Sequence, residues 1–586
     1  MRTKPLLVAG CALALALPVL AQQPGPPQPI QPAPAPVQSN VVSPTPATPS
    51  PSSTGAGAGD TGVSELTLEQ LPPPPPPVEY PAHARRDPWV VGRLDPVEIG
   101  LGPNPWGTAN GTFMSSLMRR MDTPIASRWA HIALRNALLA KARAPNAVNP
   151  VDWVAERAWL LLRLGEADAA RMLVADVDSD RFTPKLTQVG VQSALANADP
   201  PALCPLQPGI RKYDPGIRAL VSAMCASLSG EPESASAQVD DARRHGRIGG
   251  IDLTLAEKVV GAGADTGRAV TIEWDPVDRL TAWRFGLSAA TGMVPPDRLI
   301  KDASPQLRAF QARAPLLSAD QRLDSARIAA GLGVFSSQSM IDLYSTIYDS
   351  TDSSDLAGTD AWQIRQAFVG KDRDVKLAAM RRLLDGAKDP LQREATRALL
   401  GRAAALIQPD PDLEKDAPEL ISAMLAAGYD RAAQRWGASV RSMDGDTADR
   451  CWAMLALASA DPRGLDFSGS RINSFIGRDK SPGKVRSALL VAGLAGLGRI
   501  SVDAAQSLSR RNGLGFGRQS VWTRMIDAAA GRGQPASVLV LAGTGLQTRD
   551  FAGIPGAHMY HIVAGLMRTR QDYTARMIAA EALSRT

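Results

Sequence analysis

The segment from Trp153 to Val177 constrains the fold of this chain most strongly, because it predicts two short helices joined by a glycine turn. The first part reads WVAERAWLLLRLG, with apolar residues at helical spacing and charged residues between them. Gly165 should end this helix, since glycine enters the left-handed C-terminal turn at no steric cost. The second part, EADAARMLVADV, opens with acidic residues, which favour a helix N-terminus. Two helices joined so closely must pack antiparallel.

A single pair of this size is too small to bury both of its apolar stripes, so neighbouring pairs must stack on it. The same pattern recurs later in the chain. An Ala-Ala pair follows Gly428 as it follows Gly165, the sequence ARML at 170–173 has a counterpart ARMI at 575–578, and Gly498 and Gly533 mark further turns. One copy would fit an ordinary helical hairpin in a globular domain, but the recurrence predicts an array. At roughly 35–45 residues per pair, the array would hold about a dozen pairs.

Composition agrees with an all-helical protein. The chain has 586 residues, aromatic residues make up only 5%, and no alternation of apolar and polar residues persists long enough to predict a sheet. We therefore predict an all-α fold, an α/α helical-repeat solenoid (superhelix) that spans residues 111–586 and is preceded by a disordered Pro-rich linker.

The turn LRLGEADAA at 162–170 and its later copies resemble the tetratricopeptide-like class of α-solenoids. The resemblance implies a concave binding surface and usually no chemistry. No unit meets the family consensus of Trp, Leu-Gly, Tyr, Ala and Pro, so no functional residue is carried over from the family.

The N-terminal residues 1–21 have the pattern of a secretory signal peptide, with a basic start, an apolar core and small residues before a cleavage point after Ala21. A lipoprotein signal ending at Cys11 is an alternative, but only about five apolar residues precede that cysteine. No later stretch is long and apolar enough to span a bilayer. We therefore expect a periplasmic or secreted protein.

Two further segments lie between the signal peptide and the helices. Residues 22–80 are rich in Pro, Ala, Ser and Gln, which predicts a disordered or polyproline linker. It is either a spacer or a binding segment. Residues 81–110 contain too much Pro and Gly for a helix, and we expect an extended arm that packs on the solenoid through Trp89 and Trp106.

Three cysteines would remain after signal-peptide cleavage, and an oxidising compartment favours pairing. Cys204 lies in a Pro-rich loop and Cys225 in the following helix, so a helical hairpin would bring them together. We predict a Cys204–Cys225 disulfide and a free, buried Cys451. No histidine has a spacing that suggests a catalytic cysteine.

Candidate metal and nucleotide sites fail on their spacing. His558 and His561 can share a helical face, but no acidic third ligand follows. The segment 176–180 begins like a calcium loop, yet Arg181 stands where glycine is required. The acidic segment 349–360 is interpreted as a solvated turn. We therefore predict no metal and no cofactor.

The segment 477–485, GRDKSPGKV, resembles a phosphate loop only superficially. Five residues separate its glycines instead of four, and Val485 replaces the Ser or Thr that would bind magnesium. Its Ser-x-x-Lys motif lacks the Lys-Thr-Gly partner of penicillin-binding enzymes, and no Gly-x-Ser-x-Gly elbow is present. No catalytic residue is predicted.

The leading hypothesis is a non-enzymatic protein-binding or scaffold protein of the bacterial cell envelope, with a protein or peptide partner. Peptidoglycan or polysaccharide is a second candidate ligand. The alternative is a peptidoglycan-acting enzyme or glycan-binding protein with a superhelical domain, as in soluble lytic transglycosylases. Their catalytic Glu-Ser motif is missing from the last third of this chain. Nucleic acid is not expected as a partner, because the basic residues are dispersed and the protein is predicted to be secreted.

Overall fold

The computed structural model describes residues 81–121, 124–210, 215–245, 248–263 and 270–586. The predicted signal peptide with its cleavage point at Ala21, the alternative lipoprotein Cys11 and the predicted linker at 22–80 lie outside these residues. The described part is an α/α helical-repeat solenoid, as predicted, with almost no β-structure.

The helices begin and end where local sequence dictates. Asn149 caps one helix and Pro150 opens it, for example, because proline fits the first turn, where no N–H is needed. The helices of the first half are α1 Gly111–Arg119, α2 Arg128–Leu139, α3 Pro150–Arg163, α4 Ala167–Ala175, α5 Pro184–Ala196, α6 Gln207–Ile210, α7 Pro215–Leu228, α8 Pro232–His245, α9 Gly250–Gly263, α10 Ala282–Ala290, α11 Asp297–Lys301, α12 Pro305–Ala312, α13 Ala319–Leu332 and α14 Ser337–Ser350. Those of the second half are α15 Ser353–Leu356, α16 Asp360–Val369, α17 Arg373–Gly386, α18 Pro390–Ala405, α19 Ala417–Ala426, α20 Asp430–Gln434, α21 Gly437–Val440, α22 Gly445–Ala458, α23 Gly469–Arg478, α24 Val485–Gly496, α25 Val502–Asn512, α26 Val521–Gly531, α27 Pro535–Gly545, α28 Gly556–Arg568 and α29 Asp572–Ser584.

The predicted glycine turns join consecutive helices. Gly165, Gly428, Gly498 and Gly533 all adopt positive φ, between 64° and 88°. At the first of them, the N–H of Gly165 donates to the Leu162 carbonyl and the next N–H donates to the Leu161 carbonyl, which satisfies the carbonyls at the end of α3. The final copy, between α28 and α29, has Arg570 at the left-handed position, with φ 61°.

Two hydrophobic cores hold the helices together. The larger one runs from the arm to α29, and the smaller one is formed by residues of α5, α7, α8, α9 and α10 with their connections. Cys225 belongs to the smaller core and Cys204 packs against it. The long repeat therefore contains a satellite core around the disulfide.

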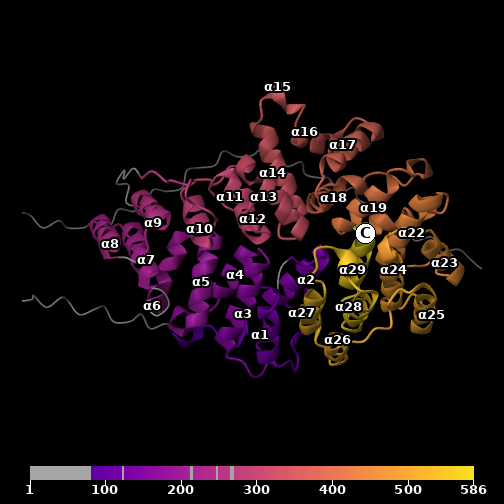
Figure 1. Ribbon diagram of the computed structural model, residues 1–586, viewed down its shortest axis with the longest axis horizontal. Helices are drawn as coiled ribbons and strands as arrows, with labels where there is room; N and C mark the ends of the chain where they lie inside the picture. The colour runs from indigo at the N-terminus through magenta and orange to yellow at the C-terminus, as the bar shows by residue number, and fades with distance from the viewer. Residues whose placement is uncertain (1–80, 122–123, 211–214, 246–247, 264–269) are drawn as a thin grey trace, which may run out of the picture. The chain divides into compact units, whose positions relative to one another are not determined.

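The first helices of the described part pack against the last ones. Helix α2 contacts α27 and α29, which Figure 1 shows as indigo ribbon beside yellow ribbon. The N–H of Ala126 donates to the carbonyl of Leu546 at 2.9 Å. The Glu581 carboxylate, from the last helix, accepts hydrogen bonds from Ser127 and from the backbone N–H of Arg128 at the start of α2. These contacts join residues more than 400 positions apart.

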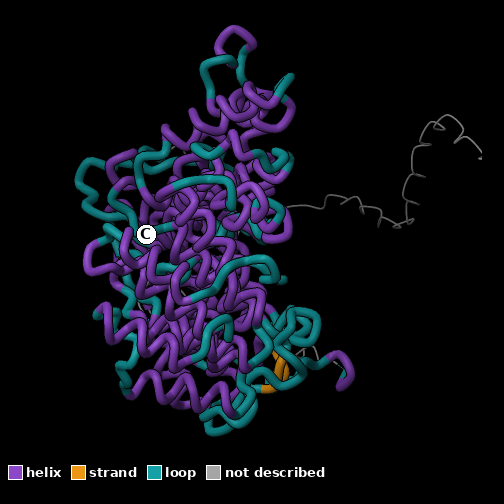
Figure 2. The backbone as a smooth tube through the Cα atoms, turned by 90° about the vertical axis from the view of Figure 1, so that its right-hand side faces the viewer, coloured by secondary structure: helices purple, strands orange, loops and turns teal. Residues whose placement is uncertain are grey.

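The arm at 81–110 lies against both ends of this arrangement. Its strand β1 (Val90–Val91) pairs antiparallel with β2 (Ala142–Arg143), the orange segment in Figure 2. Trp106 is 1% exposed and meets Trp153 edge to face, with ring centroids 4.9 Å apart. Trp89 keeps 37% of its surface exposed and lies under the Arg143 guanidinium.

Some helices escape the sequence pattern. Helix α14 reads SQSMIDLYSTIYDS, rich in Ser, Thr, Asp and β-branched residues of modest helix propensity, so its sequence is only a weak signal for a helix. The preceding helix α13 ends at Gly333, which adopts φ 98°. Within the described residues, no helix is both long and apolar enough to cross a membrane.

Candidate functional site

A cavity of about 330 Å³ lies where α2, the start of α14, α18 and the turn between α19 and α20 meet. We call it the arginine pocket, because Arg128, Arg135 and Arg402 line it. Among the described residues that form its lining, none is Asp or Glu. The pocket therefore has one sign of charge.

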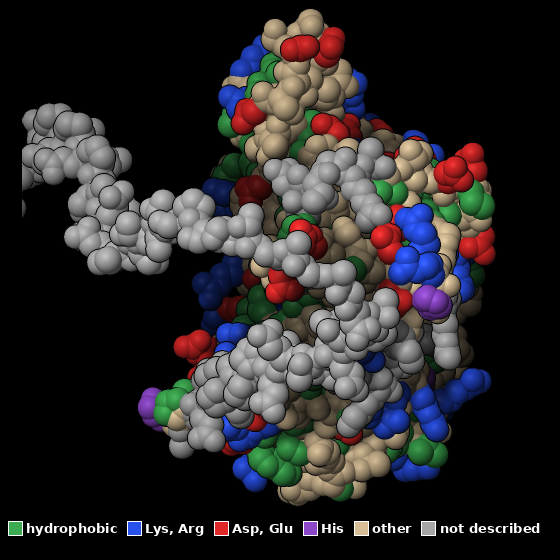
Figure 3. Space-filling view, turned by 90° about the vertical axis from the view of Figure 1, so that its left-hand side faces the viewer, with side chains coloured by type: hydrophobic (Ala, Val, Ile, Leu, Met, Phe, Trp, Pro, Cys, Tyr) green, Lys and Arg blue, Asp and Glu red, His purple; other side chains and the backbone are tan. Residues whose placement is uncertain are grey.

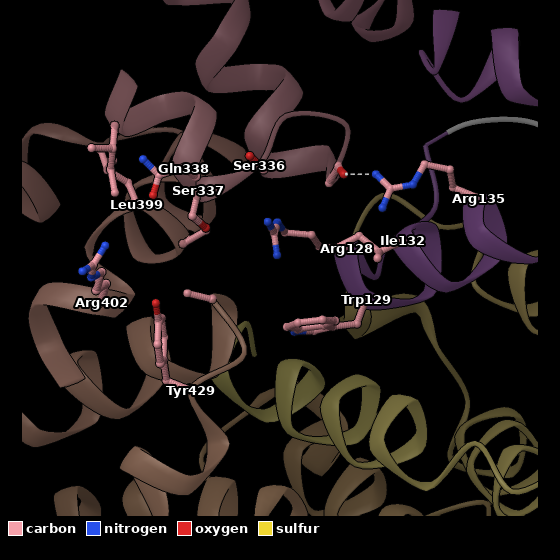
Figure 4. Close-up of a pocket in the computed structure, with 14 residues that line it drawn as sticks. Arg128, Trp129, Ile132, Arg135, Ser336, Ser337, Gln338, Leu399, Arg402 and Tyr429 are labelled. Atoms are coloured by element: carbon pink, nitrogen blue, oxygen red, sulfur yellow. Dashed lines mark hydrogen bonds between the residues drawn. The ribbon is translucent and has the colours of Figure 1, made fainter. Parts of the chain in front are cut away.

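Arg128 forms the inner end of the pocket. It is only 5% exposed, and its guanidinium donates to the carbonyls of Ala330 and Ala426, which end α13 and α19. Figure 4 shows this guanidinium pointing into the space between Ser337 and Trp129. Burial lowers the pKa of Arg128 from its usual value, although nearby carboxylates oppose that shift. The group still carries its charge at neutral pH, because an arginine pKa stays far above 7.

The carboxylates that oppose the shift lie behind Arg128. Glu581 is 4% exposed and Glu394, on α18, is 2% exposed. Burial raises the pKa of Glu581, while Arg585, at 2.6 Å, lowers it. One oxygen of Glu394 has no hydrogen-bond partner among the described residues. Glu581 accepts a hydrogen bond from the backbone N–H of Arg128, so this carboxylate holds the start of α2 in place.

The other two arginines, Arg135 and Arg402, differ in the contacts that they make with the protein. Arg135 donates to Glu166 at 3.3 Å and reaches the Gly333 carbonyl at 3.5 Å, the contact that is dashed in Figure 4. Arg402 is exposed and makes no hydrogen bond or ion pair with any residue that the structure describes. Arg402 is therefore the cation most available to a ligand.

Uncharged donors and aromatic rings complete the pocket. The N-terminus of α14 faces it through Ser336, Ser337 and Gln338, and a helix N-terminus attracts anions. The Tyr429 hydroxyl points into the same space in Figure 4 and has no partner among the described residues. Trp129 lies along one side, with its ring 5.6 Å from that of Tyr573. The arrangement suits an anionic group attached to a flat or apolar moiety.

The structure also places the residues that the sequence singled out. Cys204 and Cys225 are joined by a disulfide with their Cα atoms 5.6 Å apart. Cys451 is a buried free cysteine, and burial raises the pKa of its thiol to about 12. A thiol that stays protonated at neutral pH is a poor nucleophile.

The two histidines of the His-x-x-His pair face different partners. His561 contacts the Asp527 carboxylate at 2.9 Å, whereas the ring of His558 packs against that of Trp522 at a tilt of 36°, with centroids 4.4 Å apart. Burial lowers the pKa of His558. In the part of the chain that the structure describes, no group of three His, Cys, Asp or Glu side chains could hold a metal ion.

The segment that begins like a calcium loop anchors the arm. Its carboxylates face the arginines of the arm, in the pairs Asp176 with Arg93, Asp178 with the N–H of Arg86, and Asp180 with Arg85. In the acidic segment 349–360, Asp360 pairs with Arg327 at 2.7 Å.

The segment 477–485, which superficially resembles a phosphate loop, contains a carboxylate at the position of the expected anion. The Asp479 carboxylate accepts hydrogen bonds from the N–H and hydroxyl of both Ser481 and Ser487. Burial alone would raise the pKa of Asp479, but these bonds hold it below the usual value. A carboxylate therefore occupies the start of α24, where a phosphate would otherwise bind.

Sequence reasoning missed every residue of the arginine pocket. Arg128 and Arg135 are seven positions apart, so they share one face of α2, and this spacing is the only local signal. Arg402 and Tyr429 come from distant helices, and nothing in their flanking sequence marks them.

Comparison with known proteins does not assign the chain to a family. No model of a protein family matches the chain, and neither a curated protein nor a solved structure matches it.

Proposed function

We propose that this chain is a non-enzymatic binding protein of the bacterial cell envelope, built on a tetratricopeptide-like solenoid. In this proposal the arginine pocket holds an anionic group, a carboxylate or a phosphate, of a protein or peptide ligand. The observation that carries the proposal is the single sign of charge in the pocket: three arginines and a helix N-terminus, with no Asp or Glu among the described lining residues.

Two features support the envelope location. Residues 1–21 have the composition of a signal peptide, and the Cys204–Cys225 disulfide fits an oxidising compartment. Mass spectrometry of the secreted or periplasmic fraction should find a mature protein that begins at Gln22. A protein retained in the cytoplasm with residues 1–21 intact would contradict this location.

The binding test uses the mature protein as bait in a bacterial envelope extract, followed by affinity measurements with the recovered partner. Arg402→Glu should weaken binding strongly, because a charge-assisted hydrogen bond contributes about 1.5–3 kcal/mol, or roughly ten- to a hundredfold in affinity. Arg510→Glu, on α25 and outside the pocket, is the matched control. A partner that binds both variants equally would refute the role of the pocket.

The alternative, a peptidoglycan-acting enzyme or glycan-binding protein, is tested in the same preparation. Peptidoglycan stem peptides also end in carboxylates, so the arginine pocket is compatible with them. Purified peptidoglycan is incubated with the mature protein and its soluble products are measured. Release of fragments would overturn the non-enzymatic proposal, while Arg402-dependent binding without release would name peptidoglycan as the ligand.

A further inference from the structure

A second surface, separate from the arginine pocket, lies between the start of α1 and the hairpin of α26 and α27. It contains two cavities of about 450 Å³ and 620 Å³. Asn110 and Phe113 line both cavities, so the two adjoin and form one groove. We call it the Phe113 groove.

The groove exposes apolar side chains. Phe113 is 44% exposed and Val521 is 64% exposed, and Met114 and Met525 also line the groove. Methionine is flexible and polarisable, so it adapts to different apolar side chains. Large exposed apolar groups gathered around a concavity are typical of surfaces that bind another protein.

Three arginines flank these apolar residues: Arg120 at the end of α1, Arg524 on α26, and Arg532 directly after α26. All three are exposed, and none makes an ion pair or a side-chain hydrogen bond with a residue that the structure describes. None of the described residues that line the groove is acidic. Asp527, the acidic residue of α26, is paired instead with His561 and Arg568.

Most arginines elsewhere in the first and last helices have a partner, as Arg135 has Glu166 and Arg576 has Asp430. The face of the molecule in Figure 3, on the left-hand side of Figure 1, carries both acidic and basic side chains. The unpaired arginines of the groove therefore present a charge that a partner can neutralise.

A buried hydroxyl group at the groove also lacks a hydrogen-bond partner. Ser537, on α27, lines the cavity of about 450 Å³, and it is 2% exposed. Its hydroxyl has no hydrogen-bond partner among the described residues. Buried hydroxyls are normally satisfied, so an unsatisfied one beside a cavity suits a ligand that supplies the missing acceptor.

We propose that the Phe113 groove binds an acidic amphipathic segment of another protein. Apolar side chains of the segment insert beside Phe113 and Met525, and its carboxylates pair with Arg524 and Arg532. A concave site of this size accepts individual side chains, whereas a flat lipid surface has no protrusion to fill it. The proposal does not depend on the arginine pocket, so either can fail alone.

The test is a selection of random peptides of about a dozen residues, displayed on phage, against the immobilised mature protein. Selected peptides should combine Asp or Glu with Leu, Phe or Trp. Their affinities are then measured by fluorescence anisotropy for the wild type, for Phe113→Ala and for the double variant Arg524→Glu, Arg532→Glu. The double variant Arg510→Glu, Arg511→Glu on α25 is the matched charge control.

Affinity should fall about tenfold or more in both groove variants and stay unchanged in the control, with a weaker affinity at higher salt. Melting temperature is recorded for each variant, and the charge reversal at exposed positions keeps the test valid if Phe113→Ala unfolds. The proposal is overturned if no acidic peptide is enriched, or if the enriched peptides bind the groove variants normally. Groove-dependent binding to phosphatidylglycerol vesicles, without peptide binding, would overturn it as well.

Discussion

The glycine turns offer a matched pair of substitutions that separates two physical effects. Gly165 and Gly498 both follow a helix at positive φ, 88° and 69°. A Cβ added at Gly165 would lie 2.8 Å from the Cβ of Ala309, whereas a Cβ at Gly498 would meet no atom within 4 Å. Gly165→Ala therefore combines backbone strain with a steric clash, and Gly498→Ala carries the strain alone.

The magnitudes follow from these geometries. Left-handed backbone costs a non-glycine residue about 1–2 kcal/mol, and the stiffer unfolded chain offsets about 0.4–1 kcal/mol of that. Gly498→Ala should therefore lower the free energy of unfolding by about 1 kcal/mol. Overpacking adds about 1–3 kcal/mol at Gly165, because Ala309 is on α12 and its Cβ moves only with the helix backbone.

The assay is equilibrium unfolding in urea, followed by far-UV circular dichroism with the disulfide intact. Amide hydrogen exchange of α3, α4 and α12 shows whether the loss is local to the contact. Gly165→Ala should be clearly the more destabilising variant, with faster exchange in all three helices. Equal losses in the two variants would refute the argument that close packing of α12 on this turn selects glycine.

Three further substitutions test local features. Cys204→Ser combined with Cys225→Ser should lower the free energy of unfolding by about 3 kcal/mol, since the disulfide closes a loop of 21 residues; urea midpoints of the oxidised protein and the variant measure it. Burial alone would raise the pKa of Glu419, but its bonds to Arg397 lower it from 4.5 to about 2. The ionised Glu419 therefore stabilises the fold above pH 4.5, and this contribution, on the order of 3 kcal/mol, is lost as the pH falls towards 2. Glu419→Gln should show a flatter pH dependence of stability over that window. Asp479→Ala should cost about 1–3 kcal/mol, because it leaves the donors of Ser481 and of the buried Ser487 without an acceptor, and a thermal melt detects it.

Each of these three predictions would be contradicted by a specific result. Identical urea midpoints for the oxidised protein and the double variant would show that the disulfide does not stabilise the smaller core. A Glu419→Gln variant that keeps the wild-type loss of stability in acid would assign that loss to other carboxylates. Asp503→Ala, in the first turn of α25, is the control for Asp479→Ala, and an equal effect of the two would show that the bonds to Ser481 and Ser487 contribute little.

The sequence by itself determined the helices and the way they are joined. Apolar spacing and a following glycine are local properties, so the turns at Gly165 and Gly428 could be predicted from a short window of sequence. The Cys204–Cys225 pairing was also accessible, since the two cysteines are close in the chain and the intervening hairpin is short. Helix α14 could not be predicted from its sequence because its residues have modest intrinsic helix propensity. Contacts with α13 and α18 stabilise it instead.

Only the tertiary structure decided where the charged side chains meet. Arg128, Arg402 and Tyr429 come from three separate helical pairs, and Glu581 reaches the start of α2 from the last helix. The packing of α2 on α29 creates the contact with Glu581, and the junction of α2 with α14, α18 and the turn after α19 forms the pocket. Each pair of helices carries no local sequence mark of the partner on which it stacks. A repeated pattern predicts that helix pairs stack, but not which surfaces the stacking brings together, and both the arginine pocket and the Phe113 groove lie at such junctions.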